Sequence, residues 1–201
     1  MTGLSLEALE KNNSGAIELF KGKIITTING KSFVYRNIVQ EDFLDIKLDI
    51  RSCLNVYESL KNYVKNEIFE NENGQIFEKN SMFKNMPKVL FITLLRFEFN
   101  KLTKKKSKIN TNFIFYDVLD FKEFTYNKTE NKYSLQAVLI HSGDIDFGHY
   151  YTFIKTDMSN KRWHKFDDNL VVECEERDVF SEGYGETQNI SAYILVYTKT
   201  D

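Results

Sequence analysis

The sequence predicts an α+β domain in which antiparallel β-structure dominates. Short β-branched and aromatic runs recur along most of the chain, one segment carries helical spacing, and turn signals separate the runs. The chain has 201 residues, of which 42% are hydrophobic and 14% aromatic. It is therefore long enough to bury a sizeable core as one domain, or as one domain with a lobe.

The N-terminal part is expected to form a short helix and then a meander of three strands. A partial leucine stripe predicts an amphipathic helix over 2–11, ended by a polar NNSG segment. The β-rich runs 24–28 and 32–35 are joined through an Asn-Gly pair, which readily takes the positive φ angles of a hairpin turn. A mostly alternating segment over 43–50 predicts a third strand with one buried face.

The middle of the chain is expected to hold one helix and a central strand. Apolar residues spaced three or four apart predict a helix of about four turns from Asn55 to Ile68, with Asn55 and Glu58 as a cap and its reciprocal partner. The NENGQ segment predicts a turn, and 80–85 a polar approach to Pro87. The nearly all-apolar run 89–97 suits a strand covered on both faces in the middle of a sheet.

The C-terminal half is expected to be mainly antiparallel. The lysine-rich run 101–108 predicts a solvated loop rather than an anion-binding site, since it stands alone in an acidic chain. Beyond it, short aromatic or apolar runs predict strands near 113–115, 119–124, 133–140, 150–155, 162–166 and 192–197.

Charge and cysteine content narrow the classes of partner. A net charge of −2 gives no electrostatic reason to bind nucleic acid or an anionic membrane, so we expect a protein or small-molecule partner. No stretch has the apolar length of a membrane span, and the first residues do not form a signal peptide. Two cysteines are too few for a disulfide framework. We therefore expect an intracellular protein of the cytoplasm or nucleus.

Two segments near the C-terminus carry a candidate catalytic pair. His149 follows a glycine at the start of a predicted strand, while Asp167 and Asp168 end the next one, and a short loop would make these strands neighbours. A histidine oriented by an aspartate supplies two members of a thiol-hydrolase triad, whose third member is a thiolate. On residue types alone such a pair is more often structural, so both interpretations stay open.

Seven segments extend this pattern over most of the chain. In order they read LFKGKIITTI, EDFLDIKLDI, MPKVLFITLLRFEFN, YSLQAVLIHSGDIDFGHYYTFI, RWHKFDDNLVVEC, YG and SAYILVY. The series resembles the ubiquitin-specific protease family of papain-like deubiquitinating cysteine proteases, with the herpesvirus-associated subgroup most similar. The resemblance runs from about Leu19 to Tyr197 and implies the fingers and palm of a papain-like fold, dominated by antiparallel sheet.

The resemblance also implies a chemistry for the candidate pair. His149 matches the general base and Asp167 its orienter, while Asp168 matches an auxiliary polar group or an alternative orienter. In the family a thiolate attacks the carbonyl of ubiquitin's terminal glycine, the histidine protonates the departing lysine amine, and water hydrolyses the thioester.

Residues around the histidine match the site for ubiquitin's C-terminal tail. By the resemblance, Tyr150 lines the channel for that tail, and the segment from Asp144 to Gly148 forms a blocking loop over it. The lysine-rich run would lie near another such loop. Ubiquitin or ubiquitinated proteins are therefore the expected partners.

The chain departs from the family pattern at the nucleophile. The family's cysteine box and oxyanion-stabilising asparagine precede the LFKGK segment, and nothing upstream of Leu19 contains either. We therefore expect 1–18 to be a remnant of the preceding helical segment and 19–201 to be the fingers-and-palm part, with the thumb missing. The chain alone is then expected to be inactive on ubiquitin conjugates, and to aggregate or to need a partner such as the missing thumb segment.

The two cysteines are expected to be packing residues. Neither Cys53 nor Cys174 matches the family's nucleophile position. A zinc hydrolase built on His141, His149 and Asp167 is disfavoured, because no HExxH-like spacing accompanies them.

The finger positions that carry zinc in many relatives lack cysteines. Gly30 and Phe33 hold the positions of the first CxxC pair, so packing is expected to hold the finger hairpin. No metal and no cofactor are expected.

Two rival functions remain. One is a pseudoenzyme that binds ubiquitin or ubiquitin-like tails without cleaving them, and the other is a β-rich interaction module whose histidine and aspartate are structural. A cysteine box in the DNA upstream of the first codon would favour a fragment of an enzyme over the binder.

Overall fold

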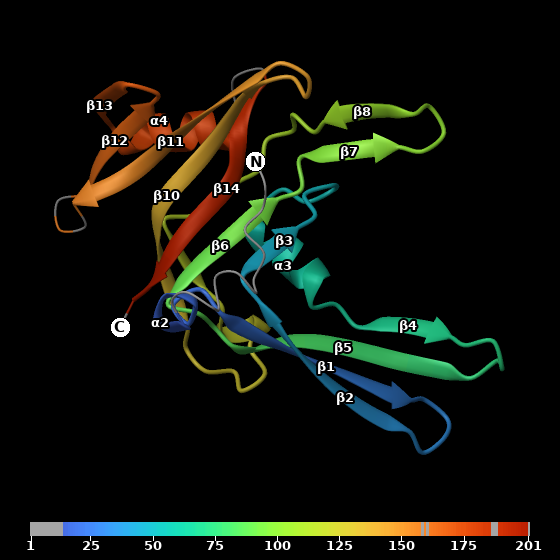
Figure 1. The fold of residues 1–201 in the computed structure, drawn as a ribbon. Coiled ribbons are helices and arrows are strands. Elements are labelled where there is room, and N and C mark those ends of the chain that lie inside the picture. The colour runs from blue at the N-terminus through green and yellow to red at the C-terminus, as the bar shows by residue number, and fades with distance from the viewer. Residues whose placement is uncertain (1–13, 158, 160, 186–188, 201) are drawn as a thin grey trace.

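Two β-sheets and a separate hairpin make up most of the protein (Figure 1). The computed structural model describes residues 14–157, 159, 161–185 and 189–200, so the helix predicted over 2–11 lies outside the described residues. Strands dominate the described part and a few short helices accompany them, which confirms the predicted α+β class. No helix in these ranges is long and apolar enough to cross a membrane.

The larger sheet, which we call the body sheet, carries the C-terminal half. Its strands run in the order β13 (Leu170–Cys174), β12 (Arg162–Asp167), β11 (Gly148–Asp157), β10 (Lys132–Gly143), β14 (Ile190–Lys199), β6 (Val89–Leu94) and β3 (Asp45–Leu48), with β9 (Val118–Asp120) beside β10. Each pair is antiparallel except β3 with β6. The helix α4 (Glu176–Tyr184) packs against β10, β12 and β14, where Val179 is fully buried.

The smaller sheet forms an arm that extends from the body (Figure 1). Its antiparallel strands run in the order β2 (Arg36–Phe43), β1 (Gly22–Gly30), β5 (Ile76–Asn85) and β4 (Glu67–Glu70). At the far end, ring centroids lie 5.2 to 6.3 Å apart in a cluster of Phe33, Tyr35, Phe69 and Phe77. Aromatic packing therefore closes the tip of the arm.

Phe83 joins the arm to the body. This residue of β5 is fully buried. Its ring lies 5.6 Å from that of Phe43 in the arm, 5.6 Å from that of Tyr63, and 6.0 Å from that of Phe121 in the body. One side chain thus contacts both parts of the molecule.

The predicted meander is wrong in two of its strands. The hairpin of β1 and β2 exists, but 32–35 forms its connection and the second strand starts only afterwards. The expected third strand, β3, leaves the arm and pairs in parallel with β6, because Ile46 and Leu48 are fully buried in the body. The segment 80–85 is part of β5 rather than a polar approach to the proline.

The predicted helix is present but shorter. The helix α3 spans Val56–Tyr63, and Ile68 lies instead in β4. The predicted cap is confirmed, since Asn55 Oδ1 accepts a hydrogen bond from the Glu58 N–H at 3.0 Å and Asn55 Nδ2 donates to Glu58 Oε1 at 3.1 Å.

Further along the chain, four expectations need correction. The run 89–97 forms β6 only as far as Leu94, with one face more buried than the other. The lysine-rich run is half of a hairpin, not a loop, because β7 (Phe97–Asn100) pairs with β8 (Lys105–Lys108). No strand forms at 113–115, and 119–124 divides between β9 and a 3₁₀ turn, η1 (Lys122–Phe124). The short helix α2 (Ser14–Ile17), β13 and α4 were not predicted.

Candidate active site

His149 stands at the start of β11, directly after a short connection from β10. The connection is the segment 144–147, which we call the His loop. Gly143, the last residue of β10, has φ 102°, a conformation that glycine adopts without strain. The Asp144 N–H donates to the carbonyl of Phe147 at 3.2 Å. The histidine therefore projects from the end of a strand beside a tight loop.

His149 and Asp167 are in contact across β11 and β12. His149 Nε2 lies 2.5 Å from Asp167 Oδ1. Thr152 pairs with Phe166, and the same register continued by one residue sets Tyr151 opposite Asp167. Because alternate residues share a face, His149 lies on the face of Asp167. The predicted meeting of the histidine with an aspartate is confirmed.

A β-bulge in β11 decides which aspartate shares that face. At the far end of the strand pair Asp157 lies opposite Arg162, and the register then slips by one residue at Thr156. If the register that pairs Asp157 with Arg162 continued along the strands without this slip, Asp168 would lie on the face of His149. The bulge therefore selects the first aspartate of the pair.

Asp168 lies in the turn after β12. Its side chain is exposed and its φ is 50°, in the left-handed region. One ligand atom each from His149, Asp167 and Asp168 lie within 4.8 Å of one another. The first two of these atoms already bond to each other, which makes the group an acid–base pair with an adjacent carboxylate.

The carboxylates favour a protonated imidazole. The hydrogen bond with Asp167 raises the pKa of His149 above 6.5, and the charges of Asp167 and Asp168 act in the same direction. Desolvation and the charge of Lys165 oppose this. The imidazolium persists to a higher pH than in a free histidine. A step in which neutral imidazole takes a proton therefore becomes faster as pH rises through the raised pKa.

An open groove lies at the same end of β11. It has a volume of about 430 Å³ and is lined by Phe97, Glu98, Phe99, Lys106, Ile145, Tyr150 and Tyr193. Tyr150 follows His149 in the strand, so its side chain lies on the opposite face, with its ring 4.7 Å from that of His141. Mostly apolar walls with a few polar groups suit an extended peptide.

Gly148 makes room for the buried ring of His141. A Cβ at this position would lie 2.0 Å from His141 Nε2. The ring of His141 packs against those of Phe97 and Tyr150, so it cannot move without repacking the floor of the groove. We expect Gly148→Ala to lower the free energy of unfolding by about 1–3 kcal/mol, measured by chemical denaturation. At Gly15 a Cβ meets nothing within 4 Å, so Gly15→Ala is the control, and equal effects would contradict the prediction.

Lys108 holds the base of the His loop. Its Nζ donates to the carbonyls of Asn189 at 2.7 Å, His141 at 3.0 Å and Gly143 at 3.1 Å. Burial, and then the charge of Arg96, lowers the pKa of Lys108 to about 8. Sequence reasoning missed this residue, because nothing in a run of lysines marks the one that is half-buried.

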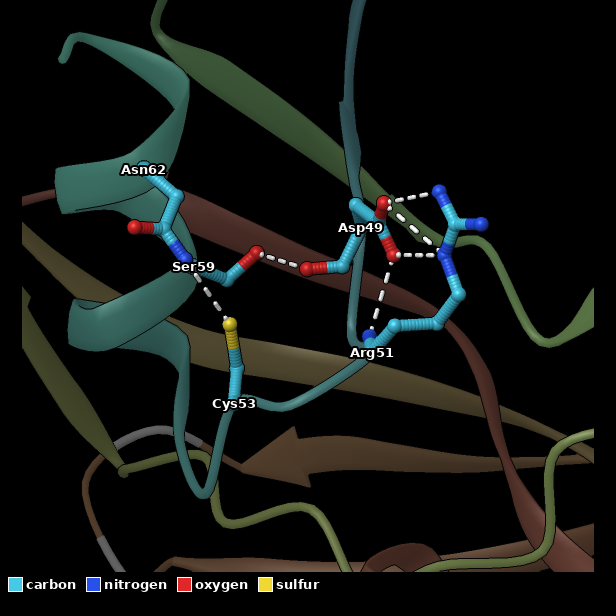
Figure 2. A network of polar contacts seen from close by, with 5 residues as sticks. All are labelled: Asp49, Arg51, Cys53, Ser59 and Asn62. Carbon is cyan, nitrogen blue, oxygen red and sulfur yellow. Dashed lines mark hydrogen bonds and ion pairs between the residues drawn. The ribbon is translucent and has the colours of Figure 1, made fainter.

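Cys53 lies far from the histidine. It is buried before α3, where its Sγ accepts a hydrogen bond from Asn62 Nδ2 at 3.2 Å (Figure 2). The same segment is fixed by Arg51, which bonds the carboxylate of Asp49, and by Ser59, whose Oγ donates to the Asp49 carbonyl at 2.6 Å. The helix α3 packs on β3, which lies four strands from β11 in the body sheet. Roughly 19 Å therefore separates Cys53 from the site.

Cys174 is nearer but also displaced. Leu170 on β13 pairs with Asp167, whereas Cys174 lies four residues further along the strand, opposite Trp163. That offset is roughly 13 Å. Burial, assisted by nearby carboxylates, raises the pKa of the Cys174 thiol, which disfavours the thiolate. Both cysteines are placed as packing residues.

Comparison with known proteins gives the family. Residues 3–197 match the family model described as ubiquitin carboxyl-terminal hydrolase. The chain belongs to the ubiquitin carboxyl-terminal hydrolase family. Ubiquitin carboxyl-terminal hydrolase 7 of Drosophila melanogaster is 33% identical over 96% of the chain and 19% of its own length. Ubiquitin carboxyl-terminal hydrolase 15 of Saccharomyces cerevisiae is 31% identical over 98% of the chain and 20% of its own length. The chain thus spans a small part of these hydrolases.

Solved structures of similar proteins share the fold. The structure of the yeast SAGA DUBm has a TM-score of 0.81 at 25% identity, covering 99% of this chain and 46% of that one. A SAGA DUB module bound to monoubiquitin has a TM-score of 0.79 at 26% identity, covering 92% of this chain and 41% of that one. The predicted papain-like deubiquitinase fold is confirmed for this member of the ubiquitin carboxyl-terminal hydrolase family.

Proposed function

We propose that this chain is the ubiquitin-binding, acid–base part of a cysteine-type deubiquitinase. The 2.5 Å contact between His149 and Asp167, at the same end of β11 as the groove lined by Tyr150, carries the proposal. The family match supports ubiquitin as the partner, and so does a neighbouring structure described as bound to monoubiquitin. Within the family, the resemblance of the sequence segments favours the herpesvirus-associated subgroup.

In this proposal His149 is the general base and Asp167 orients it. A thiolate attacks the carbonyl of ubiquitin's last glycine, the histidine passes its proton to the departing lysine amine, and water then cleaves the thioester. Asp167 accepts the Nε2 hydrogen, which leaves Nδ1 for the proton of the thiol. Tyr150 and the segment from Asp144 to Gly148 would hold the tail of ubiquitin.

The nucleophile in this mechanism is a cysteine outside these 201 residues. By strand spacing, Cys53 lies roughly 19 Å across the sheet from the pair and Cys174 roughly 13 Å along β13 from it, beyond the reach of direct proton transfer. We therefore propose that residues 19–201 act as fingers and palm, and that a thumb segment, for which 1–18 would be the last remnant, supplies the thiol.

The proposal is tested with a fluorogenic amide of ubiquitin. The purified chain is expected to give no turnover. Fusion to the region of the Drosophila hydrolase 7 that precedes its match should restore turnover, and His149→Ala in the fusion should abolish it. Turnover by the chain alone, or a fusion that remains active without His149, would sink the proposal.

A non-cleaving ubiquitin binder is the second candidate, favoured by the distance of both cysteines from His149. It predicts that the chain binds ubiquitin in a titration calorimeter while the fusion stays inactive. A fusion that turns over substrate excludes it.

A further inference from the structure

Asp167 is contacted on both of its oxygens. Oδ1 bonds His149, and Oδ2 lies 4.0 Å from the Nζ of Lys165. Lys165 precedes Asp167 by two residues in β12, so both side chains lie on the same face. A carboxylate rotates easily about its last torsion. The contact with Lys165 adds a second restraint on that rotation to the hydrogen bond with His149.

Lys165 is itself fixed from the other side. Its Nζ lies 3.7 Å from Glu182 Oε2 on α4 and 3.8 Å from the centroid of the Tyr151 ring. The hydroxyl of Tyr151 donates to Glu182, so these three residues hold one another. The lysine side chain is 25% exposed, which leaves it partly shielded from water.

Charges alternate from the site to the helix. The imidazole of His149 is followed by the carboxylate of Asp167, the ammonium of Lys165 and the carboxylate of Glu182. Each charge has a partner of opposite sign within 4.0 Å. The thiol of Cys174 also lies near the lysine and Glu182. Such an array fixes geometry more than any single exposed ion pair does.

We propose that Lys165 is a positioning residue that, anchored by Glu182 and Tyr151, holds the Asp167 carboxylate with Oδ1 toward His149. A role of Lys165 in catalysis rests on the proposed function. Its effect on the position of Asp167 does not, because the influence of Asp167 on the pKa of His149 can be measured without turnover.

A double-mutant cycle tests this by NMR titration of the chain's three histidines. Asp167→Asn should lower the pKa of His149 by roughly one unit, since it removes a neighbouring anion. With Lys165→Met in place, the same Asp167→Asn change should lower that pKa by less than half as much, because an unheld carboxylate supports the ring less. If Lys165 acted by its charge alone, Asp167→Asn would lower the pKa of His149 by the same amount with and without Lys165→Met.

The controls separate position from charge. Lys161 pairs with Asp117 away from His149, so Lys161→Met should leave the full drop. Lys165→Arg should keep most of it. If Lys165→Met does not fold, Lys165→Gln, which keeps an amide donor, takes its place. An undiminished drop in the Lys165→Met or Lys165→Gln background overturns the inference.

Discussion

Replacing Asp167 by asparagine is expected to lower the turnover number of the active fusion by up to about 10⁴-fold, the loss that this change causes in a serine-hydrolase triad. The amide is neutral, so it stabilises the imidazolium less than the carboxylate does. The acid limb of the pH–rate profile should also move to lower pH, because the pKa of His149 is raised mainly by Asp167. Steady-state kinetics on ubiquitin amide across pH 5–9 measures both.

Asp168→Asn is the matched control for this change. Asp168 is exposed and follows the selected aspartate by one residue, so we expect a loss below about tenfold. A loss as large as that of Asp167→Asn would show that Asp168 orients the histidine in the working enzyme.

Phe83→Ala is expected to have the largest effect on stability. Removing a fully buried phenylalanine that contacts Phe43, Tyr63 and Phe121 should lower the free energy of unfolding by about 3–5 kcal/mol. Urea denaturation followed by circular dichroism measures this change.

The tip of the arm provides the control for that change. Phe69 stacks on Phe77 but is 41% exposed, so Phe69→Ala should cost about 1 kcal/mol or less. An equal loss of unfolding free energy for Phe69→Ala and Phe83→Ala would show that the contact between arm and body at Phe83 does not contribute more to stability than the tip of the arm.

Features determined by neighbours in the chain were predictable. The cap of α3 depends on Asn55 and Glu58, three residues apart, and formed as expected. The meeting of His149 with an aspartate needed only two consecutive strands and a short loop. Local spacing contains this information, since turn length fixes which strands become neighbours.

Features determined by distant partners were not predictable. β3 alternates like a strand of the meander, yet it pairs with β6 more than forty residues later, because Ile46 and Leu48 gain full burial there. The roles of Lys108 and Lys165 depend in the same way on Asn189 and Glu182, which no local pattern links to them. The spacing of apolar residues along the chain cannot predict which strands pair with each other or which residues a charged side chain contacts.

The bulge at Thr156 has a consequence for how the site tolerates change in chain length. Deleting a single residue of β12 between the bulge and Asp167 would shift the register by one and turn Asp167 away from His149. The same deletion would move Asp168 into the position opposite Tyr151, on the face of His149. Because the two aspartates are adjacent, such a deletion replaces one carboxylate by another instead of leaving the imidazole without a partner.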